Sequence, residues 1–194
     1  MSRLYQLDES VFRFIHVDMH QPWLDYVMRF ITDTGRGEVK FTVLVVLCFV
    51  YRYRQHMLMF LAAGVTSGLL AQVIKQLVSR ERPGNLEFAQ PVASYIEAMM
   101  GQAAPIASNS FPSGHATSCF GIAVAVVWLC RGGDRAWVGW AVLGWATLVS
   151  FSRVYLGVHY LSDVLAGAVL GAGVGTLAWI LWRKKGWIAS AGRH

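Results

Sequence analysis

The chain has 194 residues, of which 55% are hydrophobic and only 14% are charged, and its formal net charge is +6 at pH 7. So apolar a composition does not suit a water-soluble globule of this length, and it favours an integral membrane protein. A positive charge can indicate nucleic-acid binding, but here the basic residues mark the ends of apolar segments and form no single stripe. Nucleic acid is therefore not an expected partner, and the bilayer is.

The first 36 residues differ from the rest, because acidic and basic residues interrupt every apolar run. Their apolar residues recur at helical spacing: Val11, Phe12 and Ile15, then Trp23, Leu24, Val27, Met28 and Ile31. This pattern predicts two amphipathic helices lying on the bilayer surface. The stretch lacks the series of basic start, apolar core and small-residue cleavage site, so we do not expect a removable signal peptide.

Several later segments are apolar enough to cross a membrane. A spanning helix needs about 20 mainly apolar residues, or about 17 when polar flanks reach the interface. Four segments between charged residues meet this requirement: 57–74, 113–130, 136–152 and 164–182. A fifth, 37–51, has a shorter apolar core and spans if Lys40 extends to the interface. The sequence predicts an all-α, polytopic membrane helix bundle of five or six transmembrane helices with N-terminal interfacial helices.

Basic residues at alternate ends of successive spans predict the orientation. They are Arg52 and Arg54, then Arg131 and Arg135, then Arg183, Lys184 and Lys185. The positive-inside rule makes their side cytoplasmic, which predicts a multi-pass protein whose three remaining polar clusters face the other side. No linker or long internal repeat divides 1–194, so we expect one domain, with interfacial helices over 1–36 and a bundle over 37–185.

One long loop, 83–111, falls on the opposite, extracytoplasmic side. Its middle, around Tyr95 and Ile96, suits a short helix on the membrane surface. Two roles are consistent with a loop of this length: a lid over the bound lipid, or a passive connector between spans.

Glycines recur at fourfold spacing in the last span, as Gly167, Gly171 and Gly175, and in the second, as Gly64 and Gly68. Such patterns let helices approach closely. We expect this packing within the chain, and a homodimer is the other arrangement that the pattern permits.

Three polar clusters fall on the same side as the long loop. The first is "KQLVSRERP", in which Lys75 and Arg82 are seven residues apart. Seven residues are two helical turns, so both side chains share a face if the helix continues. Pro83 disfavours helix at the residue before it, which places Arg82 near a break.

The second cluster, "PSGH", begins the span at 113. Ser113 can cap the helix, and Gly114 lets the backbone come close to an anion at the helix N-terminus, with His115 beside it.

The third cluster is "SRVYLGVHYLSD". His159 and Asp163 are four residues apart, so on a helix they are neighbours. The carboxylate can then hold one ring nitrogen and leave the other as an aimed base. Arg153 precedes a break expected near Gly157 and can face the same place.

Each cluster alone is also explained by interfacial charges, a helix cap or a salt bridge. Together, at the ends of the second to fifth predicted spans, they gather cations, helix amides and two imidazoles, one of which is backed by a carboxylate. Phosphoryl transfer requires these groups, because the cations stabilise the equatorial oxygens while an imidazole attacks in line.

The three clusters resemble the signature motifs of the type 2 phosphatidic acid phosphatase superfamily, which are integral-membrane lipid phosphatases related to vanadium haloperoxidases. Lysine, six residues and Arg-Pro; Pro-Ser-Gly-His; and Ser-Arg, five residues, histidine, three residues and aspartate all stand at the family's spacing. The resemblance covers about residues 60–175.

The resemblance implies hydrolysis of a lipid phosphate through a phosphohistidine, without a metal or other cofactor. His159 is the implied nucleophile and Asp163 its orienting partner, while His115 is the implied general acid and then general base. The implied phosphate-binding residues are Lys75, Arg82, Arg153, Ser113 and Gly114. Asp163 is the only carboxylate in the second and third motifs, and Glu81 alone is too little for a magnesium site.

The N-terminal "FRFIHVDMHQPWLDYVMRFITDTG" resembles the start of bacterial members that act as undecaprenyl-diphosphatases. This implies undecaprenyl diphosphate as substrate, at an outward-facing site of a multi-pass protein of the bacterial inner membrane. Arg80 then either holds a second phosphate or is an ordinary interfacial charge. Phosphatidylglycerophosphate, phosphatidate and lipid A 1-phosphate are the alternative substrates, and an anion channel or transporter is the remote alternative.

Overall fold

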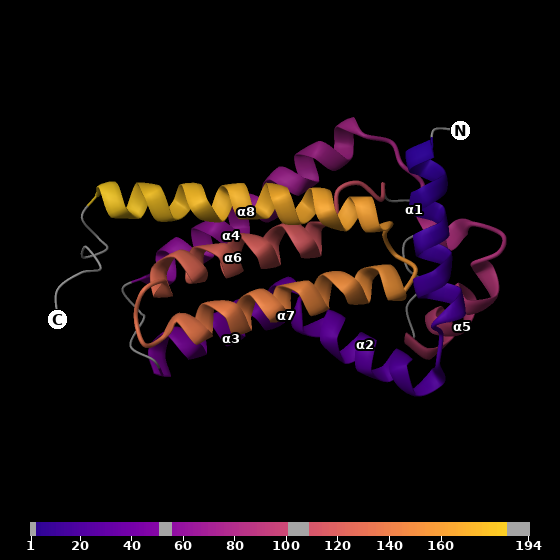
Figure 1. Cartoon of the computed structure of the whole chain (residues 1–194), viewed down its shortest axis with the longest axis horizontal. Coiled ribbons are helices and arrows are strands. Elements are labelled where there is room, and N and C mark those ends of the chain that lie inside the picture. The colour runs from indigo at the N-terminus through magenta and orange to yellow at the C-terminus, as the bar shows by residue number, and fades with distance from the viewer. Residues whose placement is uncertain (1–2, 51–55, 101–108, 186–194) are drawn as a thin grey trace.

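The computed structural model describes residues 3–50, 56–100 and 109–185, and every regular element in these ranges is helical (Figure 1). The long helices are α3 (Gly37–Val50), α4 (Met57–Leu77), α6 (Gly114–Cys130), α7 (Ala136–Tyr155) and α8 (Leu161–Lys184). The N-terminal part consists of α1 (Arg3–Arg13), the π-helical turn η1 (Phe14–Asp18) and α2 (Pro22–Thr34). The predicted all-α architecture is confirmed for this part of the chain.

Between α4 and α6 the chain forms the short turn η3 (Pro83–Asn85) and helix α5 (Gln90–Met100). Helix α5 confirms the short helix predicted around Tyr95. Residues 101–108 of the predicted loop lie outside the described residues, as do Arg52 and Arg54 of the predicted cytoplasmic side.

Helix α6 is the centre of the bundle, and it packs against α4, α7 and α8 (Figure 1). Its buried positions are mostly small, among them Ala116, Cys119, Gly121 and Ala123. Small side chains allow neighbouring helix backbones to come close together.

Helices α6 and α8 pack with their backbones close together, and this contact depends on the glycines at fourfold spacing in α8. A Cβ atom added at Gly171 would lie 2.1 Å from the Thr117 carbonyl oxygen, and one at Gly175 would lie 2.4 Å from that of Gly121. The predicted role of these glycines in packing within the chain is confirmed. In α4 one of the two glycines lies at a close helix contact: a Cβ at Gly64 would meet Ile122 of α6, whereas the space around Gly68 is open.

The N-terminal helices lie at one end of the bundle. Helix α1 crosses the ends of the long helices, and α2 packs against α7 (Figure 1). Phe12, Ile15 and Met28 are buried against the bundle, whereas Trp23 and Phe30 of α2 are exposed. Helix α2 thus has one apolar side in the protein core and another that is open to its surroundings.

Among the described helices, α4 and α8 are long and apolar enough to cross a membrane, and α6 is a shorter apolar helix. The count of five or six spans therefore stays a prediction. Arg131, Arg135, Arg183 and Lys184 lie at one end of the bundle, and α8 begins at the other end, where α1 lies (Figure 1).

We expect Gly171→Ala to destabilise the protein by about 1–3 kcal/mol, because the added methyl group meets the backbone of α6 rather than a flexible side chain. Thermal unfolding in detergent measures the effect. Gly173→Ala, on the same helix, is the control, since nothing lies within 4 Å of its added Cβ and alanine favours helix. Equal melting temperatures for the two variants would contradict the proposed packing.

Candidate active site

Asp163, at the start of α8, is fully buried and accepts hydrogen bonds from three directions. Its Oδ1 accepts from Arg80 Nη1 at 2.5 Å, and its Oδ2 accepts from the Tyr160 backbone N–H at 2.9 Å and from the Ser110 hydroxyl. The contact with Tyr160 caps α8. A buried carboxylate is costly unless it is paired, and this set of donors supplies the pairing.

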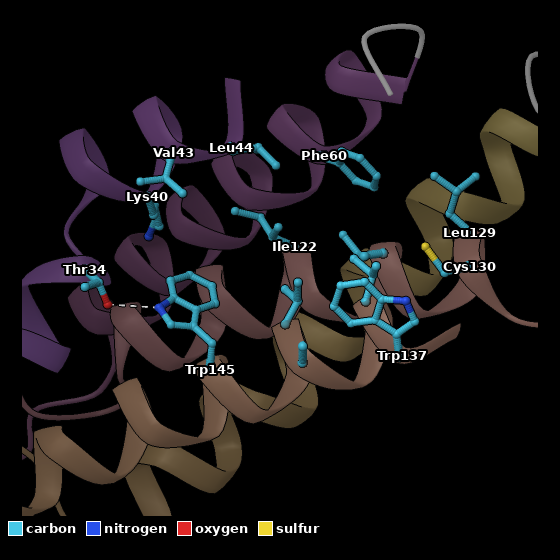
Figure 2. A pocket seen from close by; sticks show the side chains of 14 residues that line it. Thr34, Lys40, Val43, Leu44, Phe60, Ile122, Leu129, Cys130, Trp137 and Trp145 are labelled. Atoms are coloured by element: carbon cyan, nitrogen blue, oxygen red, sulfur yellow. Dashed lines mark hydrogen bonds between the residues drawn. The ribbon is translucent and has the colours of Figure 1, made fainter. Parts of the chain in front are cut away.

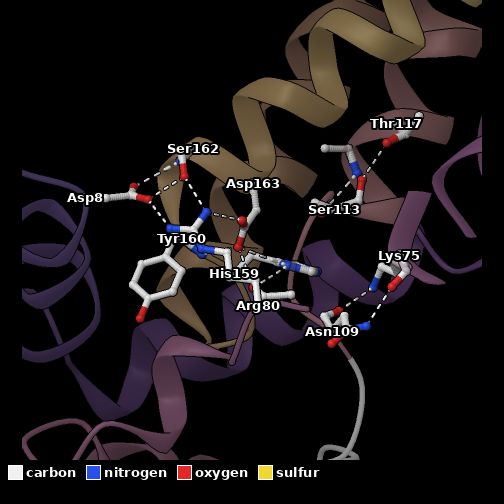
Figure 3. A network of polar contacts seen from close by, with 12 residues as sticks. Asp8, Lys75, Arg80, Asn109, Ser113, Thr117, His159, Tyr160, Ser162 and Asp163 are labelled. Atoms are coloured by element: carbon white, nitrogen blue, oxygen red, sulfur yellow. Dashed lines mark hydrogen bonds and ion pairs between the residues drawn. The ribbon is translucent and has the colours of Figure 1, made fainter. Parts of the chain in front are cut away.

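His159 lies in the turn between α7 and α8 and is 2% exposed. Its Nδ1 is 3.7 Å from Asp163 Oδ2 and 3.4 Å from Ser110 Oγ (Figure 3). Burial, together with the nearby Arg153 and Lys75, lowers the pKa of His159 to about 4, against the opposing effect of Asp163. The imidazole is therefore neutral at neutral pH and carries a lone pair.

The turn that carries His159 is fixed by backbone contacts. The N–H groups of Val158 and His159 both donate to the Arg153 carbonyl oxygen, at 3.1 and 3.3 Å. Gly157 has φ +76°, a conformation that glycine adopts without strain. Gly84, just after the first motif, donates its N–H to the Gly157 carbonyl at 3.0 Å, so the first and third motifs meet here.

Two cations, Lys75 and Arg153, lie near His159, and a third, Arg82, lies near both of them. Lys75, in the last turn of α4, donates to the Asn109 carbonyl at 3.2 Å, and Arg153 Nη1 donates to Thr32 Oγ1 at 2.9 Å. Arg82 lies in the extended segment before Pro83. The charges of Lys75, Arg82 and Arg153 act on one another and so form one positive cluster.

The second motif starts α6 beside this cluster. Ser113 is the N-cap, and its Oγ accepts from the Ala116 N–H at 3.5 Å. Its own N–H donates to the Asp163 carbonyl at 3.0 Å, which places the start of α6 against the start of α8. His115 follows in the first turn, near His159 and Arg153.

Two nitrogen atoms of these motifs are buried without a hydrogen-bond partner in the described part of the chain: His115 Nε2 and Arg153 Nε. Buried polar atoms are nearly always paired in proteins. Both atoms are therefore available to oxygen atoms of a substrate.

The structure brings together all the residues that the motifs indicated, with two corrections to their local structure. His159 does not share a helix with Asp163, because α8 begins only at Leu161 and Asp163 is used to cap it. Arg82 does not share a helix face with Lys75, since α4 ends at Leu77 and the chain is extended before Pro83.

Arg80 has neither of the roles predicted for it. Its guanidinium binds Asp163 and also Asp8 of α1, the latter at 2.6 Å, and lies 4.2 Å from the centre of the Tyr160 ring (Figure 3). Both carboxylates of this network are buried. Arg80 is thus an internal partner of Asp163, and both of its terminal nitrogens donate to carboxylates.

Comparison with known proteins identifies the family. Residues 55–187 match the PAP2 superfamily. The chain belongs to this superfamily.

Its relatives act on several lipids. PAP2 relatives include phosphatidylglycerophosphatase B of Bacillus subtilis, which is 32% identical over 79% of this chain and 72% of its own length. Undecaprenyl-diphosphatase BcrC of the same organism is 29% identical over 88% of this chain and 82% of that protein. The lipid A 4'-phosphatase of Bacteroides thetaiotaomicron is 28% identical over 93% and 79%.

A solved structure supports the assignment. The transmembrane PAP2-type phosphatidylglycerolphosphate phosphatase from Bacillus subtilis has a TM-score of 0.77 and 27% identity, covering 100% of this chain and 90% of that one. The present chain is accordingly a PAP2 lipid phosphatase, and the lipid it acts on is a separate question.

Sequence reasoning missed three polar residues that contact the PAP2 motifs. Ser110 bridges His159 and Asp163, Thr32 binds Arg153, and Asp8 binds Arg80. Asp8 had one available signal, because it stands three and four residues before Val11 and Phe12 and so shares the apolar face of the predicted helix. Within the described residues, no group of three or more histidine, cysteine, aspartate or glutamate side chains is placed to hold a metal ion.

We expect Asp8→Asn to lower kcat by about tenfold or more while KM changes little, because Arg80 loses the charge that holds it against Asp163. Phosphate release from a lipid phosphate in detergent measures both constants. Glu9→Gln, the neighbouring acid on α1, is the control. An unchanged kcat in a stably folded Asp8→Asn enzyme would show that α1 does not position Asp163.

Proposed function

We propose that this lipid phosphatase is a single-domain, polytopic enzyme of the bacterial inner membrane that converts undecaprenyl diphosphate to undecaprenyl phosphate at the extracytoplasmic face. The reaction passes through a phosphohistidine on His159. The observation that carries the mechanism is the pair of unpartnered buried nitrogens, His115 Nε2 and Arg153 Nε, in the positive cluster around a neutral His159.

In the first step, Asp163 and Ser110 hold Nδ1 of His159, which leaves Nε2 to attack the terminal phosphorus. The bond from phosphorus to the bridging oxygen breaks, and its electron pair goes to that oxygen. His115, whose protonated form is favoured once the negatively charged substrate is bound, gives the leaving oxygen its proton. Lys75, Arg82 and Arg153 stabilise the negative charge on the equatorial oxygens, with Ser113 and the Gly114 amide at the start of α6.

In the second step, His115 takes a proton from water, and the resulting hydroxide attacks phosphorus. The bond between phosphorus and His159 breaks, which releases inorganic phosphate and restores the imidazole. No metal is needed in this scheme, because cations and helix amides neutralise the charge.

The choice of undecaprenyl diphosphate is supported by the likeness of the N-terminal segment and by the similarity to BcrC over most of both chains. Phosphatidylglycerophosphate and lipid A phosphates are the competing substrates, since other relatives bear those names. The motifs that contact phosphate do not separate these lipids, because each presents a terminal phosphate.

We expect the purified enzyme in detergent and EDTA to release phosphate from undecaprenyl diphosphate with a higher kcat/KM than from phosphatidylglycerophosphate, phosphatidate or lipid A. His159→Ala should lower the rate by about a thousandfold or more, because the nucleophile is lost. His20→Asn, which changes a histidine of the N-terminal region, is the control. A requirement for added magnesium would contradict the mechanism, and a faster rate on another lipid would change the substrate.

The role of His115 can be tested with leaving groups of different basicity. We expect His115→Ala to slow phosphate transfer from phosphatidate strongly, but to leave a burst of p-nitrophenolate from p-nitrophenyl phosphate, since that leaving group needs no proton. The phosphoenzyme should then accumulate, because water is no longer activated. Equal losses on both substrates, with no burst, would assign His115 another role.

A further inference from the structure

Lys40 is a buried cation that belongs to none of the three motifs. It lies near the start of α3, is 8% exposed, and precedes an apolar run that continues to the end of the helix. Its Nζ donates to the Ser118 hydroxyl on α6 and lies 5.4 Å from the centre of the Phe41 ring. No carboxylate of the described residues forms an ion pair with it. A buried charge without a counter-charge is costly, so this position is suited to an anion.

Lys40 adjoins the candidate general acid. Ser118, its partner, is one helical turn beyond His115 and donates to the Gly114 carbonyl at 2.8 Å. Gly35, at the corner between α2 and α3, packs on the His115 ring, since a Cβ there would lie 3.2 Å from His115 Cδ2. His115 is electrostatically close to both His159 and Lys40. A substrate with its reacting phosphate at His159 and its leaving oxygen at His115 therefore extends next toward Lys40.

A cavity of about 440 Å³ begins at Lys40 and runs between α3, α6 and α7 (Figure 2). Its walls are mainly apolar and include Leu44, Ile122, Val126 and Trp137. The polar groups of Thr34 and Trp145 at the same end are already paired, because the Trp145 Nε1–H donates to the Thr34 hydroxyl at 2.9 Å and that hydroxyl donates to the Ile31 carbonyl. Lys40 is therefore the charged group that this end presents.

We propose that Lys40 binds the phosphate that stays on the lipid, and that the cavity holds the first part of the lipid tail. The site is then a specificity site for lipid diphosphates. Arg80 is less suited to this role than Lys40, because the charge of its guanidinium is already paired with Asp8 and Asp163. This inference rests on the proposed function: His159 takes the terminal phosphoryl group, the bridging oxygen receives the proton of His115, and the lipid monophosphate is left against Lys40.

The test compares a polyprenyl diphosphate with the polyprenyl monophosphate of the same tail. In Lys40→Met, which keeps the length and removes the charge, we expect kcat/KM for the diphosphate to fall by about tenfold or more and that for the monophosphate to change by less than about twofold. Lys40→Arg should recover part of the loss. Lys184→Met, at the far end of α8, should change neither constant.

Equal changes on the two substrates, or no change on either, would overturn the role of Lys40. A second measurement uses the product as inhibitor of diphosphate hydrolysis: inhibition by the polyprenyl monophosphate should weaken in Lys40→Met relative to the wild type, whereas inhibition by the polyprenol of the same tail should not, and equal inhibition of both enzymes by the monophosphate would also overturn it. Failure of the proposed function looks different, since the wild-type enzyme would then release no phosphate from either lipid.

Discussion

The structure depends on the pairing of one buried carboxylate, that of Asp163. A single side chain caps α8 through the Tyr160 N–H, faces His159, and binds both Ser110 and Arg80. These partners come from three segments, so the turn that leads into α8, the segment before α6 and the segment after α4 are held at one point. The cost of burying the charge is offset only when all of them are in place. Folding of this end and orientation of His159 are therefore one event.

The distance between α6 and α8 determines whether that arrangement can form. Ser113 donates its N–H to the Asp163 carbonyl at 3.0 Å, which requires the two helix starts to be in contact. Farther along, Gly167 and Gly171 allow the backbones to meet, because a Cβ at either would lie within 2.7 Å of an α6 oxygen. Packed helices of this kind are stiff, and sites built on stiff elements hold their geometry well. By setting the distance between α6 and α8, the glycines thus help to fix the positions of Ser113 and Asp163, although they do not contact the phosphate site themselves.

The parts of the site that sequence could predict are those set by local rules. Ser113 caps a helix, Gly157 breaks one, and glycines at fourfold spacing pack against a neighbour, and all three features follow from nearby residues. The spacing of His159 and Asp163 predicted correctly that they lie close together, but it predicted that they share a helix. In the structure Asp163 caps α8, which begins at Leu161, so His159 lies in the turn before the helix. The contact between Asp8 and Ser162 joins residues 154 positions apart, and periodicity carries no information about such a pair.

The N-terminal segment lies before the residues that match the PAP2 superfamily, which begin at 55, yet it surrounds the site. Asp8 binds Arg80, and Thr32 binds Arg153. His16 is fully buried, and its Nδ1 lies 2.7 Å from the Tyr155 carbonyl, just before the turn that carries His159. Its ring also fills the space beside Gly157, where a Cβ would lie 2.8 Å from His16 Cε1. In the proposed mechanism the family motifs supply the groups that act on phosphorus, and contacts from this segment hold two of the motif arginines in position. The same segment carries Lys40, which in our proposal distinguishes what the phosphate is attached to.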